Sequence, residues 1–133
     1  MTRFGIDALT ATRLIEAGLT ASEDHQLVAP NVLRSRVLSH LYRKVRHGEV
    51  SRDAAIEQLG RLTSMRVRLL GDRVSRAVAW QIAEQLDWDD TTNAEFVAVA
   101  KLQADAFITL DPEFARQVEG IVTIAPFDAL QAH

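Results

Sequence analysis

Short apolar runs alternate with stretches of helical period along this chain. The runs that predict strands lie at residues 3–6, 25–29, 65–71, 106–110 and 121–126. Helical periods with start and stop signals predict helices at residues 8–18, 30–47, 51–65, 73–86, 91–103 and 112–118. Strands separated in this way by helices indicate an α/β fold with a doubly wound, largely parallel central sheet.

Single residues refine this pattern at the ends of the helices. Pro30 is expected at a helix start, because proline suits the first helical position. Thr92 and Glu95 have the spacing of a capping box, which gives Glu95 a structural role. We expect Trp80 and Trp88 to pack in the core or at helix ends rather than to stack on bases.

Two aspartates, Asp7 and Asp111, each follow an apolar run directly. In open parallel sheets, ligands bind outside the carboxyl ends of the strands, where both aspartates are expected to lie. Two carboxylates that converge there repel one another unless a cation or a guanidinium lies between them. The alternative is that each caps the helix after it, and Pro112 directly after Asp111 suits that role.

Composition limits the class of protein. The 133 residues are 47% hydrophobic and 25% charged, which predicts one domain over residues 1–133. No long apolar segment and no leader-like N-terminus occur, so we expect a cytoplasmic protein without a membrane span. The absence of cysteine leaves oxygen and imidazole as metal ligands, and the histidines lack a zinc-binding spacing.

Basic residues gather in the middle of the chain. Residues 34–76 contain eleven Lys or Arg against four Asp or Glu, whereas the chain as a whole has a net charge of -3. Clustered arginine is typical of proteins that bind a phosphate backbone, and it is equally typical of a solvated helix face.

Three stretches of the sequence resemble PIN domains, specifically the VapC-type toxins of bacterial toxin–antitoxin pairs. They are GIDA at 5–8, LVAPNVLRSRVLSHLYRKVRHGEVS at 27–51 and NAEFVAVAKLQADAFITLDPEFA at 93–115. The resemblance implies a PIN-like α/β/α sandwich and a ribonuclease whose acids hold Mg²⁺ or Mn²⁺. It also implies RNA as substrate, an antitoxin-like protein as partner, and a homodimer.

The resemblance assigns the catalytic positions one by one. Asp7 and Asp111 match the first and last acids and are the expected metal ligands, and Thr109 matches the hydroxyl residue just before the last acid. Arg36 stands where the family usually has a glutamate, and Asn93 stands where it usually has an aspartate. Two of the four usual acidic positions are therefore changed.

These two changes predict weak metal binding. Asn93 retains a neutral oxygen but loses a charge, whereas Arg36 places a fixed cation in the site. A like charge about 4 Å from a metal ion costs on the order of several kcal/mol at an effective dielectric constant of about 20. We hypothesise that Arg36 acts as a counter-ion to Asp7 or Asp111. Asp89 or Asp90, in the preceding turn, could instead restore a ligand.

Arg36 also begins a polar stripe on its predicted helix. Arg36, His40, Arg43 and His47 recur at helical spacing and are candidates for binding RNA or a protein partner. A solvated helix face is the alternative.

Three functions remain open. The first is a VapC-like, metal-dependent ribonuclease whose cleavage is weak or absent. The second is a catalytically inactive PIN domain that binds RNA or an antitoxin-like protein. The third is a receiver-like signalling domain, which also gathers acids at strand ends but needs a late lysine, and this chain has no lysine after Lys101.

Overall fold

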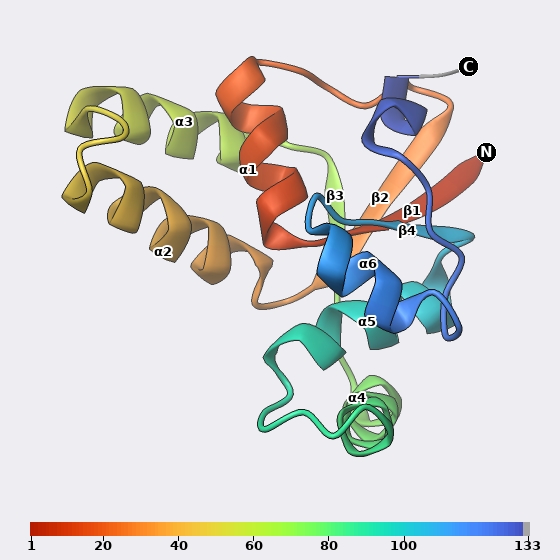
Figure 1. The fold of residues 1–133 in the computed structure, drawn as a ribbon. Helices are drawn as coiled ribbons and strands as arrows, with labels where there is room; N and C mark the ends of the chain where they lie inside the picture. Colours follow the sequence, from red (N-terminus) through yellow and green to blue (C-terminus); the bar gives the residue numbers. More distant parts are fainter. Residues whose placement is uncertain (132–133) are drawn as a thin grey trace.

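Four parallel strands form the centre of the molecule. Figure 1 shows the computed structural model of the protein, which describes residues 1–131. The strands are β1 (Thr2–Ile6), β2 (His25–Pro30), β3 (Val67–Leu70) and β4 (Ala106–Ile108). Their order across the sheet is β3-β2-β1-β4, and every neighbouring pair is parallel.

Helices cover both faces of this sheet. The helices are α1 (Ala8–Ala17), α2 (Leu33–Arg46), α3 (Arg52–Ser64), α4 (Arg73–Gln85), α5 (Thr92–Gln103) and α6 (Pro112–Val118), followed by the short 3-10 helix η1 (Phe127–Gln131). Helices α1, α2 and α3 pack together on one side of the sheet, and α5 lies against β1 and β2 with α4 outside it (Figure 1). The predicted doubly wound α/β/α fold is therefore confirmed.

Side-chain caps at helix starts explain why the helices begin where they do. The carboxylates of Asp7, Asp72 and Asp111 and the hydroxyl of Ser51 accept hydrogen bonds from backbone N–H groups in the first turn of α1, α4, α6 and α3. At the other end of α1, Gly18 has a φ of 65° and closes the helix in the left-handed conformation that glycine adopts without strain. These caps match the predicted boundaries.

Helix α5 is the most deeply buried helix because it lies between the sheet and α4. Phe96, Val97 and Ala100 are each at most 4% exposed. The backbone of α5 approaches β1 so closely that a Cβ added at Gly5 would lie 2.6 Å from the Cβ of Ala100. Glycine at this position therefore sets the distance between the helix and the strand.

The predicted last strand at residues 121–126 is wrong. The segment makes one isolated bridge to β4, between Phe107 and Ile124. Its first two residues turn back instead, and the N–H groups of Ile121 and Val122 both donate to the carbonyl of Val118 at the end of α6. Pro126 then removes a donor and ends the pairing.

Three smaller predictions also need correction. Pro30 ends β2, opposite Leu70 of β3, and the next helix begins only at Leu33. The capping box of α5 does not form, because Thr91 occupies the N-cap position and makes no side-chain bond there. Trp80 is 65% exposed on α4 rather than packed, whereas Trp88 stacks edge-on against Phe114 as expected.

Within residues 1–131, none of the helices combines the length and the apolar character that crossing a membrane requires.

The contact between Gly5 and Ala100 predicts a stability difference between two glycines. Gly5→Ala should lower the free energy of unfolding by about 1–3 kcal/mol, because the added methyl group forces α5 away from β1. Gly60→Ala is the matched control, since its added Cβ meets no atom within 4 Å and it lies inside α3, so it should raise stability by about 0.5–1 kcal/mol. Urea unfolding measures both, and a Gly5→Ala protein as stable as the wild type would contradict the account.

Candidate functional site

The two strand-end aspartates lie at the point where the strand order reverses. The chain runs from β1 outward to β2 and β3 and then returns to place β4 on the other side of β1. Asp7 follows Ile6, which pairs with Ile108 at the end of β4, and Asp111 lies three residues beyond Ile108. Both therefore belong to the same carboxyl edge of the sheet, at the switch point where ligands bind in folds of this kind.

Asp7 is a buried carboxylate held by α1. The residue is 6% exposed, and one of its carboxylate oxygens, Oδ1, accepts hydrogen bonds from the N–H of Thr10 at 2.9 Å and from the hydroxyl of Thr10 at 2.7 Å. The Thr10 hydroxyl also lies 3.0 Å from the carbonyl oxygen of Ile108. The carboxylate and the hydroxyl together join the ends of β1 and β4 to the start of α1.

Asp111 is an exposed N-cap. Its Oδ1 accepts the N–H groups of Glu113 at 3.0 Å and Phe114 at 3.2 Å, and its own N–H donates to the hydroxyl of Thr109 at 3.2 Å. Thr109 thus orients the turn that leads into α6. For both aspartates the capping role is present, and the second carboxylate oxygen of each remains outside these bonds.

Arg36 extends from α2 toward the start of α5. Its Nη2 donates to the hydroxyl of Thr92 at 3.3 Å, and its Nε is buried without an acceptor in the described part of the chain. None of the ion pairs between described residues includes Arg36. The expected direct pairing with Asp7 or Asp111 is therefore wrong, because the guanidinium has taken a neutral hydroxyl as its partner.

Asn93 lies in the first turn of α5 and is exposed. With Trp88, Asp89 and Asp90 it lines a small hollow of about 160 Å³. Asp90 is used locally, since its Oδ1 accepts the N–H of Thr92 at 3.0 Å. Glu95 lines a different hollow, beside Pro30 and Asp72, so it points away from Asn93.

The polar stripe on α2 leads outward from this edge. Arg36 and His40 are half-buried, whereas Arg43 and His47 are exposed, and His47 is the residue that ends the helix. Arg43 donates from Nη2 to Nδ1 of His40 at 3.0 Å, which requires the neutral ring with its proton on Nε2. The stripe therefore changes along its length, from a half-buried end at the sheet edge to a solvated end.

Burial is the largest cause that lowers the pKa of His40 from its ordinary value of 6.5. The positive charge of Arg43 lowers this pKa as well, the negative charge of Asp7 raises it, and Lys44 and Arg36 lower it further. His40 thus senses charge from the buried aspartate and from the basic residues of its own helix.

The carboxyl edge offers few ligands for the Mg²⁺ or Mn²⁺ ion that the resemblance implies. Within residues 1–131, no three acidic or histidine side chains come close enough together to hold one ion. Hard cations need several oxygen ligands, and here Asp7 and Asp111 each use an oxygen to cap a helix.

Sequence reasoning missed two residues of this edge. Thr10 ties Asp7 to Ile108, and its position three residues after a strand-end aspartate is the signal that could have identified it. Thr92, whose hydroxyl accepts a hydrogen bond from Arg36, is predicted from the sequence only to cap its helix. The two residues are 56 positions apart, so no local sequence pattern indicates their contact.

The comparisons with known proteins bear on the fold. No family model matches the chain, and no curated protein matches its sequence. The chain is similar to a solved structure, the crystal structure of PAE2754 from Pyrobaculum aerophilum, with a TM-score of 0.69 and 18% sequence identity. The match covers 98% of this chain and 93% of that one, and it shows a shared fold.

The environment of His40 predicts how its pKa responds to charge changes. Asp7→Asn should lower this pKa further and Arg43→Gln should raise it, whereas Arg34→Gln, on the opposite face of α2, should leave it unchanged. NMR titration of the His40 ring measures these shifts. A His40 pKa that is above 6.5, or that does not respond to Asp7→Asn, would contradict the geometry.

The same shift predicts a contribution to stability. Because the folded-state pKa lies below the unfolded value of 6.5, the unfolded chain takes up the proton first as the pH falls. The contribution of His40 to the free energy of unfolding is therefore complete above pH 6.5. It decreases as the pH falls from 6.5 toward the pKa of His40 in the folded state.

Proposed function

We propose that this protein is a VapC-like PIN-domain protein that binds RNA at the carboxyl edge of its sheet without a metal ion, and that its ribonuclease activity is weak or absent. The observation that carries the proposal is the position of Arg36. Its guanidinium lies against Thr92 at the start of α5, one residue before Asn93, where the resemblance expects acids around a metal ion. A side-chain cation here supplies the positive charge that the bound ion supplies in such a nuclease.

The hydrogen-bonding state of Arg36 supports an anionic ligand. A buried donor without an acceptor costs free energy, and the Nε of Arg36 is such a donor. Because Nε is closed to solvent, a phosphate oxygen can accept from it only after the half-buried side chain turns outward, with a second oxygen on the remaining N–H groups as in bidentate binding of phosphate by arginine. The ligand would thus satisfy a group that the protein alone leaves unpaired.

The stripe on α2 supports a polymeric ligand over a single phosphate. Arg43 and His47 continue the line from Arg36 and His40 into solvent, over several helical turns of α2. Successive phosphates of a single strand can follow such a line, and the basic block of residues 34–76 adds long-range attraction. The buried carboxylate of Asp7 repels phosphate, so it lowers the affinity for RNA at the Arg36 end of the stripe.

The second candidate is a ribonuclease that works with one weakly bound Mn²⁺ or Mg²⁺. The position of Asp7 and Asp111 beyond the carboxyl ends of β1 and β4 favours it, because each keeps one carboxylate oxygen outside its capping bonds. An antitoxin-like protein partner and a homodimer stay predictions from the resemblance under either function.

The proposal predicts RNA binding that needs Arg36 but no metal. Binding of a labelled single-stranded RNA, followed by fluorescence anisotropy, should be equal in Mg²⁺ and in EDTA at matched ionic strength. Arg36→Gln should weaken it about tenfold, because a hydrogen bond to a charged group contributes about 1.5 kcal/mol or more. Arg34→Gln removes an exposed arginine on the opposite face of α2 and should leave the affinity nearly unchanged.

Two results would contradict the proposal. Loss of binding in EDTA would favour the metal-dependent nuclease. An equal effect of Arg34→Gln and Arg36→Gln would mean that the basic charge of α2 attracts RNA without a defined site.

A further inference from the structure

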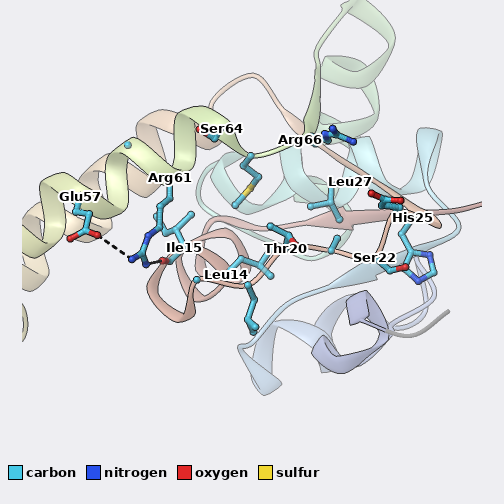
Figure 2. A pocket seen from close by; sticks show the side chains of 16 residues that line it. Leu14, Ile15, Thr20, Ser22, His25, Leu27, Glu57, Arg61, Ser64 and Arg66 are labelled. Carbon is cyan, nitrogen blue, oxygen red and sulfur yellow. Dashed lines mark hydrogen bonds and ion pairs between the residues drawn. The ribbon is translucent and has the colours of Figure 1, made fainter.

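A large cavity lies at the opposite end of the sheet from Asp7 and Asp111. It has a volume of about 860 Å³ and is open to solvent on one side. Its walls come from the end of α1, the loop at residues 18–24, the start of β2 and the second half of α3 (Figure 2). Cavities of about 300–1,000 Å³ are the usual size for small-molecule sites.

The floor of the cavity is apolar. Leu14, Ile15, Leu19, Leu27 and Met65 line it, and Leu14, Ile15 and Leu27 belong to the core of the domain. Such a surface favours an apolar body, because each Å² of apolar area removed from water contributes roughly 25 cal/mol.

The rim of the cavity carries two arginines that differ in their partners. Arg61 donates to the carbonyl of Ile15 at 2.7 Å and to a carboxylate oxygen of Glu57 at 3.3 Å, so it has a structural role at the end of α1. Arg66 makes no hydrogen bond or ion pair to another described residue, and Figure 2 shows it at the other end of the cavity from Arg61. Ser64 lies two residues from Arg66 and offers a hydroxyl on the same rim. Arg66 is thus available to an anionic group.

Gly60 gives the cavity its width. The cavity-lining residues of α3 are Glu57, Gly60, Arg61 and Ser64, whose spacing places them on one face of the helix. Glycine inside a helix is unfavourable by roughly 0.5–1 kcal/mol relative to alanine. Neither a left-handed conformation nor a close neighbour requires it here, because a Cβ at this position would meet no atom within 4 Å. A ligand that lies against the backbone of α3 would account for a glycine at this position.

We propose that this cavity binds a small amphipathic anion, with its apolar body on the floor and its negative group at Arg66 and Ser64. The charge of Arg61 is already balanced by Glu57, whereas Arg66 makes no ion pair with Glu23, the other carboxylate that lines the cavity, so Arg66 is the anchor for the ligand's charge. This site is separate from the carboxyl edge, and the inference does not rest on the function proposed there.

A fluorescent probe of the same chemistry tests this inference. The probe 8-anilinonaphthalene-1-sulfonate has an aromatic body and one negative charge, and N-phenyl-1-naphthylamine is a similar molecule without the charge. The folded wild type at pH 7 should bind the sulfonate with enhanced emission. Gly60→Leu, which places a bulky side chain in the cavity against the backbone of α3, should weaken this binding at least about tenfold, equivalent to 1.4 kcal/mol. Gly120→Leu is the matched control, because a Cβ there also meets no atom within 4 Å but lies outside the cavity.

The charged anchor is tested separately. Arg66→Gln should weaken binding of the sulfonate about two- to fivefold, as expected for a solvent-exposed charge contact, and should leave binding of the uncharged probe unchanged. Amide shifts on titration with the sulfonate should centre on Gly18, Gly60 and Leu27. Near-ultraviolet circular dichroism of each variant confirms that its tertiary structure is intact.

Three outcomes would overturn the inference. One is equal binding by the wild type and a folded Gly60→Leu variant. Another is a set of amide shifts that centres on the exposed Trp80 of α4. The third is an equal effect of Arg66→Gln on both probes, which would show that the cavity does not select an anion.

Discussion

The buried carboxylate of Asp7 is the interaction on which the geometry of the carboxyl edge depends. It ends β1, caps α1 and, through the hydroxyl of Thr10, reaches the end of β4. A carboxylate out of water is stable only when donors surround it, and here a backbone N–H and a buried hydroxyl do so. Because these donors belong to the protein, the ends of β1 and β4 are held together before any ligand arrives.

The charge balance of this edge follows from the same arrangement. Asp7 is buried and Asp111 caps α6, while Arg36 and the stripe behind it bring positive charge from α2. A metal nuclease would neutralise the substrate phosphate with a bound ion, whereas a fixed guanidinium can do so only as part of the protein. A site of this composition favours binding an anion over activating a water molecule for attack on it.

Helix α1 connects the two ends of the sheet. Its first turn is bound to Asp7, and its last turn, at Leu14, Ile15 and Gly18, forms a wall of the large cavity. The carbonyl of Ile15 also accepts a hydrogen bond from Arg61 of α3, so the end of α1 is bound to a second helix. The carboxyl edge and the cavity are therefore two distinct chemical environments on one rigid element.

The fold was predictable because its signals are local. Alternation, periodicity and the caps Asp7, Ser51 and Asp111 identified most elements within a few residues. The failures have a common cause: competition from non-local contacts. Ile121 and Val122 have strand propensity, but their N–H groups close the end of α6. Likewise, Pro30 pairs in register with β3, which a helix-start rule cannot anticipate.

The candidate site was predictable only in part, for the same reason. Strand-end position placed Asp7 and Asp111 at one edge, and helical spacing placed His40 and Arg43 on one stripe. The partner of Arg36 depends on how α2 meets α5, and the large cavity depends on how α1 meets α3. No local sequence pattern predicts how either pair of helices packs together.

The claim that Arg36 has taken the place of a metal ion is tested most directly by RNA cleavage in Mn²⁺. A labelled single-stranded RNA would be incubated with the wild type, with Asp7→Asn, and with the double variant Arg36→Glu, Asn93→Asp. The account predicts that the wild type cleaves no more than Asp7→Asn and that the double variant, with four acids at the edge, cleaves more than both. Cleavage by the wild type that Asp7→Asn abolishes would contradict it, and would mean that the reduced set of acids still supports a working nuclease.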